Sequence, residues 1–319
     1  MSIFIGYRSA LEYWRGHTRS ARVSGARGAL ATQADAASAP TLPERPPIAA
    51  DIPWNVLRDL GITGAPLHVI AAGRSFRKPE ESVRTHTLRK APPFVEVAPG
   101  LHVATPEACF LQEAQTRSLA ELAALGCELC GTYAVASDSP HFTRPLRPRI
   151  SVADLTSFIG GAPAQPGLAN ARRALAHLVD RSASRGQTAF ILLLCLPTAQ
   201  GGFGLPKPQA NDPIRIKDPS RGPRVMRRTL CWPELGFAIA LAGREDHKAH
   251  AQRVLAGRPV HDPGTTAHLM IVPSALVHDA DDFALLARNV ALCLGKPLRI
   301  TRKDFAERQA ALRRALLLG

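Results

Sequence analysis

The sequence predicts an α/β protein of two domains, and three observations support this prediction. The length of 319 residues allows two ordinary domains, each with its own core. The first half mixes short strands with helices, which indicates an α+β domain. The second half runs helix, three strands, helix, strand, helix, which indicates an α/β domain with a central mixed sheet flanked by helices. We place these domains at residues 1–150 and 151–300, followed by a C-terminal helix at 301–319.

Residues 221–247 form the centre of the second domain. Arg224 to Cys231 is basic and tolerates a strand, and Leu235 to Ala242 is an almost unbroken apolar run, typical of a strand buried on both faces. Trp232-Pro233-Glu234 joins the two strands. The other elements expected in this half are strands at 213–216 and 267–272 and helices at 169–180, 187–196, 245–255 and 282–294.

The first half opens with a short apolar strand followed by a helix. We expect this helix to start at Ser9, because Glu12 three residues later has the spacing of a capping box. The proline-rich residues 132–150 are expected to form a loop. Alternation and turn signals predict strands at 67–71, 83–88, 94–97 and 101–104, and cap and breaker residues predict helices at 52–60, 106–115, 118–130 and 151–158.

Residues 17–47 are rich in Ala, Ser, Arg and Pro and show no apolar periodicity. They offer little burial to offset the entropy of ordering the chain, so we predict a flexible insertion in the first domain. The arginines between Arg8 and Arg27, with few acids among them, also fit a transit peptide. Trp14, which is typical of a core anchor, favours the insertion.

The chain carries 40 Lys and Arg against 26 acids, a formal charge of +14. Such an excess favours polyanions as partners, nucleic acid first. Arg far outnumbers Lys and Ala is abundant, as in GC-rich genomes, so a charge scattered over solvated faces is the alternative interpretation. No apolar run reaches the roughly 18 to 20 residues of a membrane span, so we expect no membrane partner.

The six cysteines are too few for a disulfide scaffold in a chain of this length, which favours reduced thiols and a cytoplasmic protein. Cys127 and Cys130 have metal or redox spacing, but a zinc site needs two more ligands, and we interpret them as buried thiols. His68 and His86 can face each other across a sheet. No carboxylate is placed to complete a metal site there, and we predict no cofactor.

Several phrases of the first half resemble a known family. They are Pro66-Leu-His-Val69, Val83-Arg-Thr-His86, Gly100-Leu-His-Val-Ala-Thr-Pro106 and the run from Ala108 to Ala114. Together with Trp54 they resemble the C-terminal domain of AbiE-type abortive-infection antitoxins. The resemblance implies a DNA-binding repressor of a toxin-antitoxin operon. No recognisable helix-turn-helix precedes Trp54, where that family carries its DNA reader, so a cognate toxin stays open as the partner.

The second half resembles a nuclease-like domain found behind such antitoxin domains in actinobacteria. The similarity lies in Ser182-Ala-Ser184, Leu205 to Asn211, Trp232-Pro233-Glu234 and Gly243-Arg244 with His247. That domain is related to the very-short-patch-repair endonucleases, and its implied fold is the restriction-endonuclease-like PD-(D/E)xK fold. The family holds Mg²⁺ on four acids. The corresponding positions here are Gln187, Thr229, Ala240 and Ala242.

Loss of all four acids decides the expected activity. Neutral oxygens and methyl groups do not replace the carboxylates that hold Mg²⁺, so we predict a pseudo-nuclease without catalytic residues. Glu234 and His247 are residual family positions, and His247 has no metal ligand to assist. Glu245 lies past a glycine turn at a helix start, where an acid complements the helix dipole.

The leading hypothesis is a non-catalytic, antitoxin-like or DNA-associated protein. Its nucleic-acid contacts would be the arginines around the central strands. One alternative is an active metal-dependent endonuclease whose acids have migrated within the domain. Another is a protein-binding scaffold or toxin-neutralising partner that does not bind DNA. The predicted contacts are Arg224, Arg227, Arg228 and Arg244, and the candidate migrated ligands are Asp212, Asp218, Glu234 and Glu245.

Overall fold

The structure is a computed structural model. It describes the backbone of residues 2–17, 41–73, 80–136, 143–218, 222–242, 260–261 and 268–318. Side chains are described for the same residues except 144, 212–218, 222–228, 242, 260, 261, 268 and 318. The helix expected at 245–255 and most of the insertion expected at 17–47 lie outside the described residues.

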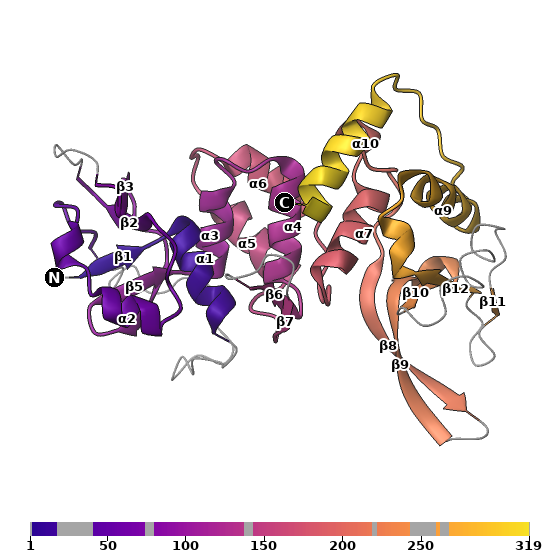
Figure 1. The fold of residues 1–319 in the computed structure, drawn as a ribbon, viewed down its shortest axis with the longest axis horizontal. Coiled ribbons are helices and arrows are strands. Elements are labelled where there is room, and N and C mark those ends of the chain that lie inside the picture. The colour runs from indigo at the N-terminus through magenta and orange to yellow at the C-terminus, as the bar shows by residue number, and fades with distance from the viewer. Residues whose placement is uncertain are drawn as a thin grey trace. The chain divides into compact units, whose positions relative to one another are not determined.

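The chain forms two compact units that interleave in sequence (Figure 1). The first comprises Met1–Arg117 and Ala134–Arg172, and the second Ser118–Tyr133 and Arg173–Gly319. A single boundary after residue 150 does not describe this arrangement. The reason lies in helix packing: α4 (Leu119–Leu129) contacts α7 (Arg185–Cys195), whereas α5 (Val152–Gly161) contacts α3 (Pro106–Glu113).

Five described strands of the first unit form a mixed sheet in the order β3-β2-β1-β5-β4. The central strand β1 is buried along its length and pairs parallel with β5 and antiparallel with β2. The predicted strands at 67–71 and 101–104 are confirmed at their bounds. The strands are β1 (Ile3–Ile5), β2 (Leu67–Ala71), β3 (Val83–Thr87), β4 (Phe94–Ala98) and β5 (Leu101–Ala104).

Helix α1 (Tyr7–Gly16) begins two residues before the predicted start, so the capping box expected from Ser9 and Glu12 is wrong. Both side chains make tertiary bonds instead. Ser9 Oγ accepts a hydrogen bond from the His68 amide at 3.0 Å. Glu12 Oε2 accepts from the amides of Thr63 and Gly64 at 3.1 and 2.8 Å. These bonds attach the buried face of α1 to the chain that leads into β2.

Residues 41–47 of the predicted insertion are described, and they include two buried positions, Leu42 and Pro47, while three of the seven residues are exposed. Leu42 is buried in a core cluster with Tyr7 and Ile70, and the carbonyl oxygen of Pro43 accepts a hydrogen bond from the Ala72 amide at 2.9 Å. These contacts attach the stretch to the first unit, which its composition does not indicate. The flank following it carries the short helix α2 (Trp54–Asp59).

The loop expected at 132–150 is also wrong in part, because two short strands, β6 (Tyr133–Val135) and β7 (Thr143–Pro145), pair with each other there. Helix α5 continues to Gly161, three residues past the predicted end at 158. Helix α6 (Leu168–Leu175) follows.

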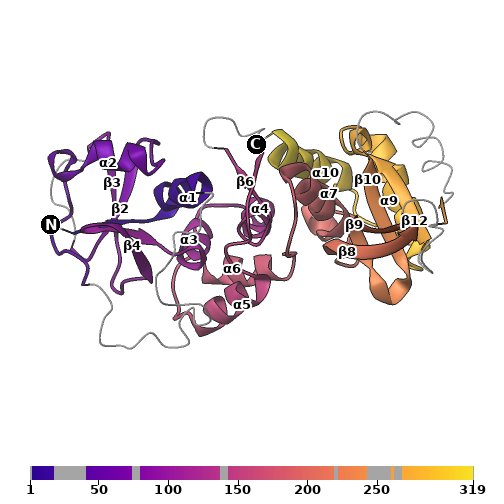
Figure 2. The same cartoon turned by 90° about the horizontal axis from the view of Figure 1, so that it is seen from below.

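The second unit contains another mixed sheet, in the order β11-β12-β10-β9-β8, flanked by helices (Figure 2). The turn predicted at Trp232-Pro233-Glu234 is confirmed as a short 3₁₀ segment between β9 and β10. Parallel pairing joins β10 to β12, and antiparallel pairing joins the other neighbours. The strands are β8 (Gln209–Asp218), β9 (Gly222–Trp232), β10 (Phe237–Ala242), β11 (Val260–His261) and β12 (His268–Pro273).

The core of the second unit forms around α7, whose residues from Gln187 to Leu194 are all buried. Phe190 meets Phe283 of α9 (Ala280–Cys293) edge to face, with ring centroids 5.4 Å apart. The expected C-terminal helix is α10 (Phe305–Arg313), which continues into a π-helical turn over Arg314–Leu318. Among the described helices, none is long and apolar enough to cross a membrane.

Candidate functional site

The first candidate site lies where α7 meets β9 and β10, at the positions that the nuclease resemblance assigns to metal-binding acids. Ser184 caps the helix, since its Oγ accepts the Gln187 amide at 3.1 Å. This cap places Gln187 in the first helical turn, where its side chain reaches β9. The structure thus brings Gln187 and Thr229 together, although 42 residues separate them in the chain.

The carboxamide of Gln187 is buried, with 3% of the residue exposed, and its two ends have different partners. Nε2 donates to the carbonyl oxygen of Thr229 at 2.7 Å. Oε1 accepts from the Ala183 amide at 2.7 Å and from Nδ2 of Asn211 at 2.9 Å. A carboxylate has no donor for the Thr229 carbonyl. The site is therefore built for an amide.

Thr229 continues this network into the next strand. Its Oγ1 accepts a hydrogen bond from the Leu241 amide of β10 at 2.9 Å. The backbone pairing of β9 with β10 runs from Trp232 to Leu230, so this side-chain bond extends the contact between the strands by one more residue. The hydroxyl is thus used in strand pairing.

The two alanine positions lie on β10. Ala240 is half-buried and packs against the small core cluster of Cys231, Ala238 and Leu269. Ala242 pairs with Pro273 of β12 in the backbone register. An apolar contact occupies position 240 where the resemblance expects a metal ligand.

The residues at this junction do not fit Mg²⁺, which prefers carboxylate oxygens and ordered water. Gln187 and Thr229 offer neutral oxygens that are already engaged, and Ala240 offers none. Among the residues described, no group of three or more His, Cys, Asp or Glu side chains could hold a metal ion. The side chains of the junction instead cross-link α7 to the sheet and β9 to β10.

The other sequence-predicted positions are dispersed. Glu234 is exposed in the turn between β9 and β10. Asp212 and Asp218 lie on β8, whereas Arg224, Arg227 and Arg228 lie on β9. Arg244, Glu245 and His247 fall outside the described residues.

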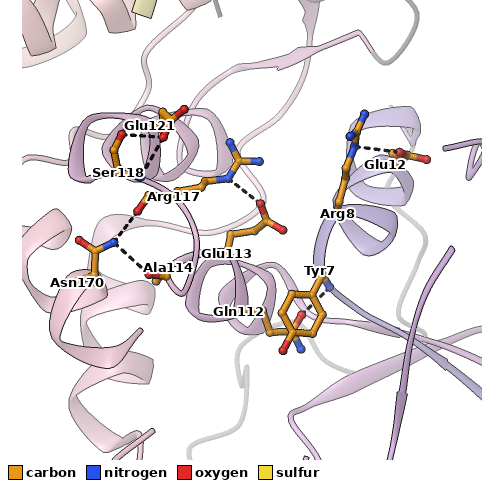
Figure 3. Close-up of polar contacts among 10 residues, drawn as sticks. All are labelled: Tyr7, Arg8, Glu12, Gln112, Glu113, Ala114, Arg117, Ser118, Glu121 and Asn170. Atoms are coloured by element: carbon orange, nitrogen blue, oxygen red, sulfur yellow. Dashed lines mark hydrogen bonds and ion pairs between the residues drawn. The ribbon is translucent and has the colours of Figure 1, made fainter. Parts of the chain in front are cut away.

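The second candidate site is a cluster of Tyr7, His68, His86, Gln112 and Glu113 in the first unit, called here the Tyr7 cluster. His68 and His86 lie on neighbouring strands and face each other as predicted, with Nδ1 of His68 3.0 Å from Nε2 of His86 in a hydrogen bond. The Tyr7 ring stacks on His86 with centroids 3.6 Å apart. Gln112 Oε1 accepts the Tyr7 amide at 2.7 Å (Figure 3).

The strained backbone of Tyr7 fixes this arrangement. Its φ of 53° lies in the left-handed region, which is unusual for a bulky residue and accompanies the sharp turn from β1 into α1. On the opposite side of the cluster, Glu113 is buried and pairs with Arg117 at 2.6 Å. Asn170 Nδ2 donates to the carbonyl oxygens of Ala114 and Arg117, which anchors the end of α3 (Figure 3).

The histidine pair is uncharged near neutral pH. Burial, together with the neighbouring His68 and Arg84, lowers the pKa of His86 to about 4. Burial also lowers the pKa of His68, again with a contribution from Arg84. The geometry of the pair is that of a half-buried polar contact between β2, β3 and Tyr7.

Sequence reasoning found His68 and His86 through strand alternation but missed Tyr7, Gln112 and Glu113. These three residues come from segments about 100 positions apart, and only the packing of α1 on α3 joins them. Gly6 before Tyr7 was the one local signal of a sharp turn.

Two of the cysteines singled out from the sequence, Cys127 and Cys130, are both buried. Burial raises the pKa of the Cys127 thiol to about 12. A thiol held so firmly protonated is a weak nucleophile and a weak metal ligand.

Comparison of the chain with protein-family models, curated proteins and solved structures found no match.

Proposed function

We propose that the protein is a non-catalytic, DNA-associated protein of antitoxin-like type, whose second unit binds duplex DNA in a nuclease-like arrangement without hydrolysing it. The observation that carries this proposal is the bond from Gln187 Nε2 to the Thr229 carbonyl. It replaces a metal-binding carboxylate with an amide that holds α7 on the sheet.

The contact between Gln187 and Thr229 supports the nuclease-like alignment. The resemblance assigns both positions to metal-binding acids, which would have to lie side by side, and the two residues do so here. The identity of these residues supports loss of the reaction. Metal-assisted hydrolysis of a phosphodiester requires anionic ligands that place Mg²⁺ beside the attacked phosphorus. An amide and a hydroxyl engaged in bonds to the protein do not supply that charge.

Charge supports DNA as the partner. The net charge of +14 favours a polyanion, and the resemblance of the first half implies a DNA-binding operon repressor. Without a base-reading motif, binding of this kind draws on phosphate contacts, varies little with sequence and weakens steeply as salt rises.

The experiment is a titration of a labelled mixed-sequence duplex with the purified full chain over a range of salt concentrations, with and without EDTA. We expect binding that is indifferent to EDTA and falls linearly on a log-log plot against salt. Binding that does not change with salt contradicts the proposal. Absence of binding at low salt favours the alternative of a protein partner, such as a cognate toxin.

A plasmid incubated with the protein and Mg²⁺ or Mn²⁺ tests the other half. We expect intact plasmid. Cleavage that EDTA abolishes would establish the alternative of an endonuclease with migrated ligands. The single variants Asp212→Asn, Asp218→Asn, Glu234→Gln and Glu245→Gln would then show which acid carries it.

A further inference from the structure

The β8–β9 pair extends beyond the rest of its sheet. Among the described residues, strand β9 pairs with β10 from Trp232 to Leu230, whereas its pairing with β8 continues to Gly222. Residues 212–218 and 222–228 therefore form a two-stranded arm, called here the β8–β9 arm, which runs past the neighbouring strands in Figure 1. Seven residues per strand at about 3.3 Å each give the arm a length of about 23 Å.

The register of the arm sorts its charged residues between two faces. Directly opposed residues of an antiparallel pair share a face, and successive residues alternate between faces. One face carries three basic positions and no acid, and we call it the basic face. It consists of the pairs Pro213 with Arg227, Arg215 with Val225 and Lys217 with Pro223.

The other face of the arm is balanced in charge. Its two arginines, Arg224 and Arg228, stand against two acids, Asp212 and Asp218, with three apolar positions between them. It consists of the pairs Asp212 with Arg228, Ile214 with Met226, Ile216 with Arg224 and Asp218 with Gly222. The arm thus concentrates its net positive charge on one face.

We propose that the basic face of the β8–β9 arm, formed by Arg215, Lys217 and Arg227, is the surface that docks on duplex DNA in or along the major groove. This inference rests on the proposed function and names the element that performs it. A two-stranded ribbon fits a major groove about 12 Å wide, and B-DNA presents a phosphate charge about every 1.7 Å along its axis.

Protection of an exposed strand edge explains only part of the pattern. Lysine and proline on an edge discourage pairing with other chains, which accounts for Lys217, Pro213 and Pro223. Edge protection does not depend on which face carries the charge. It therefore leaves unexplained why both aspartates occupy the face opposite these three cations, an arrangement that leaves a net positive charge, which attracts phosphate, on one face only.

The proposal divides the arginines of β9 into two groups. Arg227 belongs to the docking face, whereas Arg224 and Arg228 belong to the balanced face and contribute little to binding. A variant pair with equal loss of charge separates these groups. The basic-face variant combines Arg215→Gln, Lys217→Gln and Arg227→Gln. The control combines Arg224→Gln, Arg228→Gln and Arg288→Gln, the last at an exposed position of α9.

Both triple variants and the unmodified protein are titrated with the same labelled duplex over salt, after circular dichroism has shown equal helix and strand signals. We expect the basic-face variant to bind roughly tenfold or more weakly and its log-log salt slope to fall by about 3, because three fewer phosphates are neutralised. We expect the control to keep its slope within about 1 of the unmodified protein.

Each other result overturns the proposal in an identifiable way. Equal weakening in both variants means that binding follows net charge and not one face. Unchanged binding in both variants, with firm binding by the unmodified protein, places DNA elsewhere and leaves the proposed function standing. If the unmodified protein binds no DNA, the function and the docking face fall together. Stronger competition by RNA or single-stranded DNA than by duplex contradicts the named partner.

Discussion

Gln187 and Thr229 are joined by a hydrogen bond of 2.7 Å, in which the side-chain amide nitrogen of Gln187 donates to the backbone carbonyl oxygen of Thr229. In a position that the nuclease resemblance assigns to a metal ligand, the protein places a hydrogen-bond donor. The Gln187 side chain therefore cross-links α7 to the sheet.

Replacing Gln187 by glutamate tests the requirement for a donor. In Gln187→Glu an ionised oxygen would face the Thr229 carbonyl in a buried site, so we expect the free energy of unfolding to fall by about 1 to 3 kcal/mol at neutral pH. Urea unfolding measured by circular dichroism gives this value. Gln187→Met, which removes the side chain's hydrogen bonds without adding charge, is the matched control.

The same variant makes a prediction about pH. The folded-state pKa of the new carboxyl would lie above the unfolded value of about 4.3, because burial disfavours its charge and the protonated form can donate to Thr229. Stability of Gln187→Glu relative to Gln187→Met is then greatest below the unfolded pKa and is lost as pH rises through the folded pKa. A difference that does not change with pH contradicts the donor assignment.

Thr229 is expected to matter through its hydroxyl oxygen. Thr229→Val keeps the shape but leaves the Leu241 amide without its acceptor, which costs about 1 to 3 kcal/mol if the amide is left unpaired. Thr229→Ser keeps the oxygen and should lose less. Hydrogen exchange at the Leu241 amide should accelerate in the valine variant and not in the serine variant. Equal exchange in both would show that the side chain is not the acceptor.

The Tyr7 cluster predicts a specific titration. With its pKa lowered to about 4, the ring of His86 stays neutral at pH 5, where an ordinary histidine is protonated. As pH falls, His86 is protonated in the unfolded chain at a higher pH than in the folded protein. The neutral ring therefore makes its full contribution to stability above about pH 6.5, and this contribution is lost as pH falls from there toward 4. NMR titration of the ring protons measures it, with the signal assigned by its absence in His86→Phe. An ordinary pKa would contradict the buried, stacked arrangement.

Local sequence patterns predicted many of the helices and strands, because the formation of these elements depends on residues that are close together in the chain. Alternation and turn signals predicted the strands at 67–71 and 101–104, and the apolar run from 235 to 242 predicted β10, which begins two residues later, at Phe237. The interleaved units could not be predicted in this way. Residues 118–130 have the sequence pattern of a helix wherever they pack, and only the contact of this helix with α7 assigns it to the second unit.

The candidate sites show the same limit. The resemblance named Gln187 and Thr229 as positions of interest, but the hydrogen-bond partner of each side chain depends on the tertiary fold. The partner of Gln187 lies 42 residues away in the chain, and that of Thr229 lies 12 residues away. Ser9 and Glu12 show the reverse error, since a spacing that is typical of a capping box serves tertiary bonds here. A local motif predicts a local bond only when no distant partner competes for the same atoms.

The central claim is that the second unit binds DNA and has lost metal-dependent hydrolysis. One measurement tests it most directly: a Mg²⁺ and Mn²⁺ plasmid-cleavage assay on the full chain, at a protein concentration where a parallel gel shift in EDTA shows the plasmid bound. The account predicts bound plasmid that remains intact with either metal. Cleavage that requires the metal and stops with chelator would contradict it.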